Sequence, residues 1–76
     1  MPNIRKLSEL KTGEGAQVAK LLVNGSMRRR LLDIGLSPGT CVSCIGKSPF
    51  GDPAAYLVRG SAVAIRGKDA DCVIIE

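Results

Sequence analysis

The sequence predicts a small, mainly β domain in which five short strands form a closed barrel and one short helix interrupts them. Two observations lead to this fold class. Nine glycines and four prolines divide the 76 residues into short segments, as is typical of small β-rich folds. Only one of these segments repeats its apolar residues with the period of a helix. A barrel is the favoured arrangement because closure removes exposed strand edges.

The first expected strand covers residues 16–23. Its apolar residues do not alternate, because Leu21, Leu22 and Val23 are consecutive. Either both faces of this strand are partly covered or the strand is bulged.

Four further strands complete the predicted barrel. Successive side chains of a strand point to opposite faces, so Val42 and Cys44 share one face and Cys41 and Ser43 share the other. The four strands are expected at residues 41–47, 54–59, 62–66 and 72–75, with turns at 12–15, 48–53, 60–61 and 68–71 and one helical turn at 8–11.

One short helix is expected between the first two strands. Met27, Leu31 and Ile34 stand at positions i, i+4 and i+7, and this spacing forms one apolar stripe on a helix. Ser26 precedes the stripe and is a good N-cap residue. Gly35 follows the stripe, where the chain can enter the left-handed region at little cost and end the helix.

Composition excludes several classes of function. An apolar fraction of 45% in 76 residues indicates one globular domain, not a disordered chain. The chain has no His, which excludes nucleophile–base pairs built on His and imidazole metal sites. Phe50 and Tyr56 are the only aromatic residues, so binding of single-stranded nucleic acid by stacking is poorly supported.

The expected location follows from the same data. Three cysteines, an odd number, fit a reducing compartment better than a secreted disulfide framework. No apolar run is long enough to span a bilayer, and the first residues lead into no signal core. We therefore expect a single cytoplasmic domain over residues 1–76.

Arg28, Arg29 and Arg30 form the one dense run of charge. In the first turn of the helix, the macrodipole disfavours cations by about 0.3–1 kcal/mol each. Either these side chains contact an anionic partner, or they form a solvated face whose stems cover apolar surface. Leu32 lies off the apolar stripe, next to Arg28, and is either a contact for another protein or covered by the domain itself. Asp33 stands four residues after Arg29, a weak supporting pair.

The segment Cys41-Val42-Ser43-Cys44 is a C-x-x-C motif. A zinc knuckle needs a sharp turn between the two thiolates, whereas a strand directs them to opposite faces. Cys72 would add only one further ligand. Packing of the three cysteines as small apolar residues is therefore favoured, and a soft-metal site at Cys41, Cys44 and Cys72 is the weaker alternative.

The turn over residues 48–53 contains Pro49 and Pro53, which restrict the backbone. It lacks the spacing of a phosphate-binding loop. The turn either presents Phe50 as a contact tip or folds Phe50 over the end of the barrel, and the second arrangement is slightly favoured.

These residues together resemble a known family. Arg29 to Gly39 resembles the helix-to-strand segment of FeoA, the small cytosolic protein of bacterial ferrous iron transport. This run reads Arg-Arg-Leu-Leu-Asp-Ile-Gly-Leu-Ser-Pro-Gly. Pro49-Phe50-Gly51-Asp52-Pro53 follows at the spacing of that family, with Phe50 where the family usually has Leu. Arg59-Gly60 and the strand over residues 63–66 extend the similarity, which runs from about Leu7 to Ile75.

The resemblance implies an SH3-like β-barrel with a helix inserted between the first two strands. It also implies a non-enzymatic accessory protein that acts with FeoB, the membrane permease whose cytosolic G domain binds GTP. The same type of domain occurs at the C-terminus of iron-dependent repressors. Members of the family are often described as binding transition metals, without a diagnostic ligand set.

From the residues and the resemblance together, we expect an adaptor that docks on a FeoB-like permease. It is expected to need no cofactor, to bind no nucleic acid and to reach the membrane only through its partner. The expected contacts are Arg28, Arg29 and Leu32 on the helix and Phe50 and Asp52 on the loop. The expected core residues are Met27, Leu31, Ile34, Val42, Tyr56, Val58, Val63 and Ile65.

Two alternatives to this adaptor remain open. One is a metal-sensing module that binds a transition metal through thiolate or carboxylate ligands. The other is a small nucleic-acid-binding barrel that uses the arginines, for which affinity would fall linearly with the logarithm of salt concentration.

Overall fold

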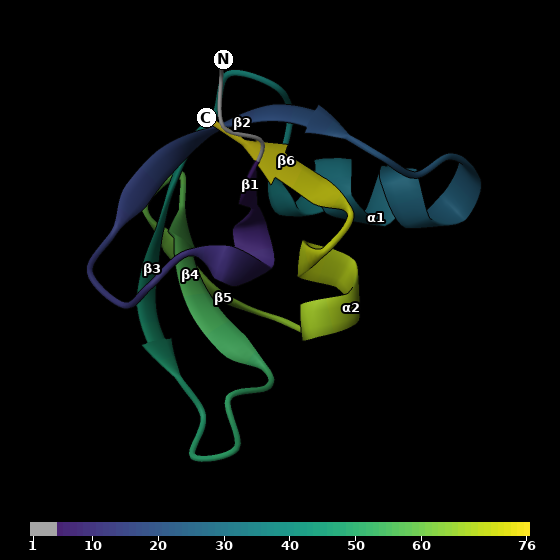
Figure 1. The fold of residues 1–76 in the computed structure, drawn as a ribbon. Helices are drawn as coiled ribbons and strands as arrows, with labels where there is room; N and C mark the ends of the chain where they lie inside the picture. Colours follow the sequence, from purple (N-terminus) through teal and green to yellow (C-terminus); the bar gives the residue numbers. More distant parts are fainter. Residues whose placement is uncertain (1–4) are drawn as a thin grey trace.

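The computed structural model describes residues 5–76 as one six-stranded antiparallel sheet with three short helical segments (Figure 1). The strands lie side by side in the order β1-β6-β2-β3-β4-β5. In chain order the elements are β1 (Arg5–Lys6), the 3₁₀ helix η1 (Leu7–Glu9), β2 (Gly15–Leu21), α1 (Gly25–Ile34), β3 (Cys41–Lys47), β4 (Ala54–Val58), β5 (Ser61–Ile65), α2 (Gly67–Ala70) and β6 (Val73–Ile75).

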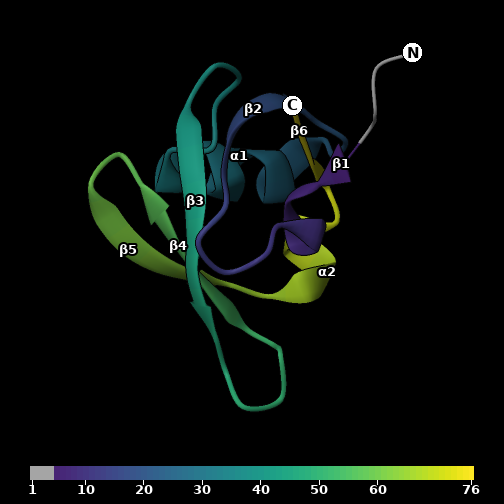
Figure 2. The ribbon, with the colours of Figure 1, turned by 60° about the vertical axis from the view of Figure 1, so that its left-hand side comes forward.

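The predicted fold class is confirmed, with six strands in place of five, but the predicted closure is incomplete because β1 and β5, the two end strands of the described sheet, do not pair with each other. The sheet curves strongly, so that β3, β4 and β5 form one side of the molecule and β1, β2 and β6 the other (Figure 2). The additional strand, β1, contains two residues and pairs with β6 through Arg5↔Ile75 and Lys6↔Ile74. A strand this short gives no periodic signal in a sequence. Residues 1–4 of the predicted domain lie outside the described residues.

The predicted strands agree closely with the observed ones. Strand β3 has the predicted bounds, β4 and β6 are each one residue shorter than predicted, and β5 begins and ends one residue earlier. Strand β2 runs from Gly15 to Leu21, and its register with β6 shifts between Val18 and Lys20. The bulge puts Val18 and Leu21, three residues apart, on the buried side of the strand. The strand ends two residues before the predicted end at residue 23, so exposed Leu22 and half-buried Val23 lie beyond it.

Helix α1 begins earlier than predicted. Its N-cap residue is Asn24 and its first residue is Gly25, so the expected cap at Ser26 is wrong. Gly25 has a positive φ of 69°. A glycine reaches this φ without steric cost, which allows the chain to turn into the helix two residues sooner. The C-terminus is as predicted: Gly35 has φ 113°, and the N–H groups of Gly35 and Leu36 donate to the carbonyls of Leu32 and Leu31. These two bonds define a Schellman motif.

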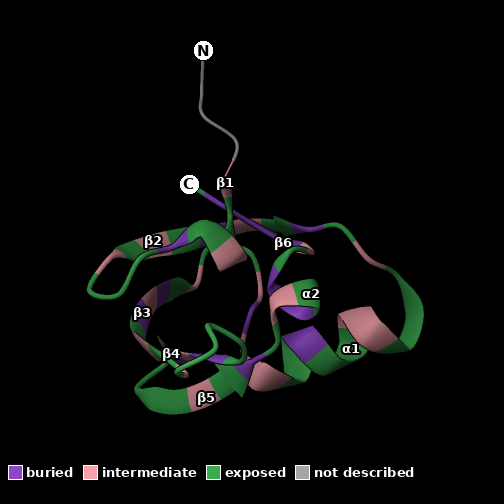
Figure 3. Ribbon diagram, turned by 60° about the horizontal axis from the view of Figure 1, so that its bottom comes forward, coloured by how far each residue is buried: buried purple, intermediate pink, exposed green. Residues whose placement is uncertain are grey.

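The core lies between the curved sheet and one side of α1, whose other side is exposed (Figure 3). Every residue predicted to be core belongs to it. Leu31, Val42, Tyr56, Val58 and Ile65 are buried, and Met27, Ile34 and Val63 are half-buried against the buried cluster. Leu7 in η1 and Leu10 directly after it are both fully buried and add to the core, and sequence periodicity did not identify them.

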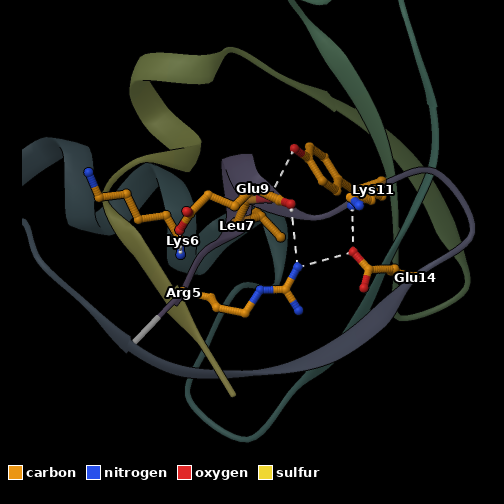
Figure 4. Close-up of polar contacts among 7 residues, drawn as sticks. Arg5, Lys6, Leu7, Glu9, Lys11 and Glu14 are labelled. Carbon is orange, nitrogen blue, oxygen red and sulfur yellow. Dashed lines mark hydrogen bonds and ion pairs between the residues drawn. The ribbon is translucent and has the colours of Figure 1, made fainter. Parts of the chain in front are cut away.

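The polar contacts of the N-terminal segment fix η1 against the sheet (Figure 4). Arg5 pairs with Glu14 at 3.0 Å between Nη2 and Oε1, and Glu14 Oε1 also accepts the backbone N–H of Lys11 at 2.8 Å. The hydrogen bond from Lys11 and the hydrogen bond from Arg5 both favour the charged carboxylate, so they lower the pKa of Glu14.

Tyr56 connects β4 with η1. Its hydroxyl donates to the carbonyl oxygen of Leu7 at 3.3 Å (Figure 4). The ring is 1% exposed, and burial, which disfavours the phenolate, raises the pKa of this side chain.

The turn predicted at residues 68–71 is instead the short helix α2. Its first N–H group, that of Gly67, donates to Asp52 Oδ1 in the β3–β4 loop at 2.8 Å. Asp52 thus accepts a hydrogen bond from an N–H group that has no partner inside the helix. Because the two residues are distant in the sequence, local sequence signals do not predict this contact. Over residues 5–76, no helix has the length and apolar character needed to cross a bilayer.

Candidate interaction surfaces

Three of the predicted contact residues lie together on α1. Arg28 is half-buried, Arg29 is exposed and Leu32 is 36% exposed. Arg28 and Leu32 are one helical turn apart and therefore neighbours on the helix surface. The predicted pair between Arg29 and Asp33 does not form, since the one ion pair within residues 5–76 joins Arg5 and Glu14. Arg29 thus presents an unengaged cation beside an exposed leucine.

The arginine run lies deeper in the helix than predicted. Because α1 starts at Gly25, Arg28 occupies its fourth position and the run extends into the second turn. The unfavourable interaction with the helix dipole declines within the first turn, so the first-turn placement of the arginines is wrong. The case for a contact here depends on their exposure and on Leu32.

Phe50 and Asp52 occupy the β3–β4 loop. Phe50 is 94% exposed at its tip, so the favoured expectation that it folds over the end of the barrel is wrong. The turn is closed by its own backbone, with Gly51 N–H donating to Ser48 O at 2.8 Å and Ser48 N–H donating to Pro53 O at 3.2 Å. Since these bonds close the turn, packing of Phe50 is not required for it.

Asp52 contacts another part of the same domain. Its Oδ1 accepts the Gly67 N–H of α2, which anchors the base of the loop. Residues 49–53 are all exposed, so Asp52 is accessible as well as Phe50.

The structure does not bring all the predicted contact residues together. Helix α1 and the tip of the β3–β4 loop lie far apart in both Figure 1 and Figure 2. The five residues therefore form two separate surfaces: Arg28, Arg29 and Leu32 on α1, and Phe50 and Asp52 at the loop.

A third surface, which sequence reasoning missed, is a groove of about 620 Å³ on the outside of β2, β3 and β4. We call it the outer groove. Cys41, Ser43, Leu57 and Arg59 line it, together with small residues of β2. The alternation of β3 placed Cys41 and Ser43 outward, as observed. The alternation of β4 puts Leu57 on the same outer face, where it is 39% exposed. This alternation was the available sequence signal for the groove.

Arg59 stands at one side of the outer groove with an uncommon backbone. It is the one residue other than glycine with positive φ, 52°, among residues 5–76. Its Nη2 donates to Ser37 Oγ at 3.2 Å and to Thr40 Oγ1 at 3.4 Å. The β4–β5 turn is thereby connected to the segment between α1 and β3.

The three cysteines are free and dispersed. Cys41 is exposed, Cys44 is buried and Cys72 is half-buried, which follows the opposite-face arrangement expected for a strand. Over residues 5–76, no three Cys, Asp or Glu side chains lie close enough to hold a metal ion.

Comparison with known proteins places this fold. Residues 5–76 match the FeoA domain family. The chain belongs to this family. Over 71 residues it is 31% identical to the Fe(2+) transport protein A/Fe(2+) transporter FeoB fusion protein of Porphyromonas gingivalis, covering 93% of this chain and 8% of that protein. The chain thus spans a small part of the curated relative it matches.

Solved FeoA structures have the same fold. Iron(II) transport protein A from Clostridium thermocellum superposes with a TM-score of 0.92 at 29% identity, over 95% of this chain and 44% of that one. FeoA of Stenotrophomonas maltophilia complexed with zinc, described as a procaryotic SH3 domain protein, has a TM-score of 0.83 at 29% identity, over 95% of this chain and 89% of that one. The SH3-like, FeoA-type barrel expected from the sequence is confirmed.

Proposed function

We propose that this FeoA-family chain is a non-enzymatic accessory protein of bacterial ferrous iron uptake that docks in the cytoplasm on a FeoB-like permease or its G domain. The observation that carries the proposal is the similarity to a protein that joins transport protein A and FeoB in one polypeptide. A covalent link keeps two modules at an effective concentration in the millimolar range. For two modules that are separate polypeptides, the affinity has to come from the contact surfaces themselves.

Helix α1 is the proposed docking surface. Leu32 supplies an apolar anchor, and Arg28 and Arg29 supply a cationic rim around it. Small transient interfaces commonly combine one desolvated apolar contact with arginine. Arg29 has no ion-pair partner within residues 5–76, so pairing with an acidic side chain of the permease would break no internal contact.

Surface recognition is the mechanism we propose, without catalysis and without a bound metal. The chain contains no His, the three thiols differ in burial, and within residues 5–76 no three potential ligands converge. We expect Co(II) added to the reduced protein to give no thiolate-to-cobalt absorption band. A tight cobalt complex that is lost on replacing any one cysteine would favour the metal-sensing alternative.

The test of docking compares Leu32→Glu and Arg29→Glu in binding to a purified FeoB-like permease in nanodiscs. Loss of an apolar anchor acts mainly on dissociation, so Leu32→Glu should raise the dissociation rate about tenfold. A rim charge acts mainly on association, so Arg29→Glu should lower the association rate and flatten its dependence on salt. Ferrous iron uptake in cells should fall for both variants.

Ile45→Glu and Lys20→Glu are the matched controls. Ile45 is 47% exposed on β3, and Lys20 is exposed on β2, so they repeat the same chemical changes away from α1. Circular dichroism first establishes that all four variants are folded. Normal binding and uptake by folded Leu32→Glu and Arg29→Glu would show that α1 is not the docking surface.

A further inference from the structure

Arg59 connects the β4–β5 turn with the end of helix α1. We propose that Arg59 is a positioning residue for the α1 docking surface: its side chain holds the last turn of α1 against the domain and so fixes the orientation in which Leu32 meets the partner. The inference rests on the proposed function, because it concerns the surface that the permease is proposed to contact. Its first test uses the free protein and needs no partner.

The backbone of Arg59 has a conformation that the turn alone would not select. Arg59 has φ 52° and the next residue, Gly60, has φ 83°. Positive φ at both central residues is the pattern of a type I′ hairpin turn, which favours Asn, Asp or Gly. A long side chain is at a steric disadvantage here. Strain of this kind persists where surrounding contacts outweigh it, so we looked for those contacts along the side chain.

The guanidinium group of Arg59 reaches the segment that follows α1. Its Nη2 donates to Ser37 Oγ at 3.2 Å and to Thr40 Oγ1 at 3.4 Å, and these two hydroxyl oxygens lie 3.0 Å apart. The backbone closes the same turn, since the Thr40 N–H donates to the Ser37 carbonyl oxygen at 3.1 Å. One guanidinium group therefore holds both ends of the turn between α1 and β3.

The stem of Arg59 packs on the last turn of α1. A Cβ atom at Gly35 would lie 3.3 Å from Arg59 Cδ and 3.5 Å from its Nε, so the stem occupies space that Gly35 leaves free. The Gly35 N–H donates to the carbonyl oxygen of Leu32 at 3.0 Å, and residues three apart are neighbours on a helix surface. The contact of Arg59 with α1 is thus one hydrogen bond away from the proposed apolar anchor.

The apolar stripe of α1 gives the helix a narrow attachment. The helix has ten residues, fewer than the about 12–15 that an isolated helix needs for stability, so tertiary contacts have to hold it. Leu31 is buried, whereas Met27 and Ile34 are half-buried. One fully buried side chain restrains rotation of a helix about its own axis only weakly, and Arg59 adds a restraint at the end that carries Leu32. A surface already fixed in its binding orientation loses less entropy on docking.

Arg59→Asn separates the turn from the side-chain contact. Asn followed by Gly60 is a preferred pair for a type I′ turn, and its side chain is too short to reach Ser37 and Thr40. The melting temperature should therefore stay the same or rise. A residue that served stability alone would lower the melting temperature when it is replaced.

The loosening of α1 is measured by NMR order parameters of backbone N–H groups in the free protein. In Arg59→Asn the values at Leu32, Gly35 and Leu36 should fall below the about 0.85 of a rigid backbone. The values at Val42 and Tyr56, buried in β3 and β4, should not change. A local fall without a loss of melting temperature is the signature of a positioning residue.

Binding to the permease in nanodiscs is the second test. Arg59→Asn should bind about threefold more weakly, within the about two- to tenfold range expected when one further group has to be ordered on binding. Lys20→Ala, which removes one charge from exposed β2, is the matched control for net charge and should bind normally. Arg59→Lys keeps the stem and one donor group and should restore part of the affinity.

A variant without the two hydroxyls distinguishes positioning from direct contact of Arg59 with the partner. Ser37→Ala combined with Thr40→Ala removes both acceptors and leaves the guanidinium group in the protein. If Arg59 acts through α1, this variant should lower the order parameters and the affinity as Arg59→Asn does. Adding Arg59→Asn to it should then cause little further loss, because both changes remove the same interaction.

Three results would overturn the proposal. These are unchanged order parameters in Arg59→Asn, normal affinity of Arg59→Asn for a permease that Leu32→Glu no longer binds, and normal affinity of the variant lacking both hydroxyls when Arg59→Asn binds weakly. The last result would make Arg59 a direct contact. Normal binding by both Leu32→Glu and Arg29→Glu would instead remove α1 from docking, and the order parameters alone would then decide whether Arg59 holds the helix.

Discussion

Gly35 serves two purposes at the same position. It ends α1 with φ 113°, and its missing side chain makes room for neighbours, because a Cβ atom there would lie 3.2 Å from Val58 Cγ1 and 3.3 Å from Arg59 Cδ. A left-handed conformation costs a non-glycine residue about 1–2 kcal/mol before any steric clash. We predict that Gly35→Val lowers the free energy of unfolding by at least about 2 kcal/mol, measured by urea denaturation.

Gly46→Val is the matched control for this prediction. Gly46 lies in β3 without a positive φ, and nothing lies within 4 Å of a Cβ atom built there. Its replacement should change stability by no more than about 0.5 kcal/mol. Equal effects of the two substitutions would mean that neither the backbone conformation nor the crowding at Gly35 matters.

At the level of elements, local signals in the sequence predict most of this fold. The alternation in β3 and the apolar stripe of α1 arise from contacts within one element, and both are observed. The elements that escape prediction depend on distant residues. Strand β1 is defined by pairing with β6, and α2 begins where Asp52 accepts the N–H of Gly67.

Glu14 stabilises the connection between β1 and β2. Glu14 pairs with Arg5 and accepts the Lys11 N–H group, and its pKa is lowered in the folded state. A carboxyl group with a lowered folded pKa contributes stability above its unfolded pKa, and the contribution is lost as pH falls through the folded pKa. We predict that Glu14→Gln is less stable than the original chain at pH 7.

The difference in stability between Glu14→Gln and the original chain should shrink as the pH falls below the ordinary glutamate value of 4.5 and vanish once Glu14 is protonated. Urea unfolding at a series of pH values measures it. Since the pair is exposed, added salt should also reduce the difference at pH 7. A difference independent of pH would indicate that the effect of the substitution is not electrostatic.

On the scale of the whole molecule, the sequence does not predict how exposed residues combine on the surface. Leu32 was singled out because it lies off the stripe of its own helix, a position that left exposure and coverage by the domain both open, and it is 36% exposed. The outer groove escaped prediction because Arg59 meets Ser37 and Thr40 only after the chain has folded. The separation of Phe50 from α1 is likewise a property of the folded sheet, because Phe50 lies at the far tip of the hairpin formed by β3 and β4.

Phe50 lies on a surface separate from α1. Phe50 is 94% exposed, so Phe50→Ser should change the free energy of unfolding by no more than about 0.5 kcal/mol. If the permease contacts both ends of the molecule, the losses in binding free energy from Phe50→Ser and Leu32→Glu should add within about 0.5 kcal/mol in the double variant, because the sites are distant and share no partner within this chain. Binding of the single and double variants to the permease in nanodiscs measures this sum. A double variant that binds as well as Leu32→Glu alone would leave α1 as the contact and assign Phe50 no part in docking.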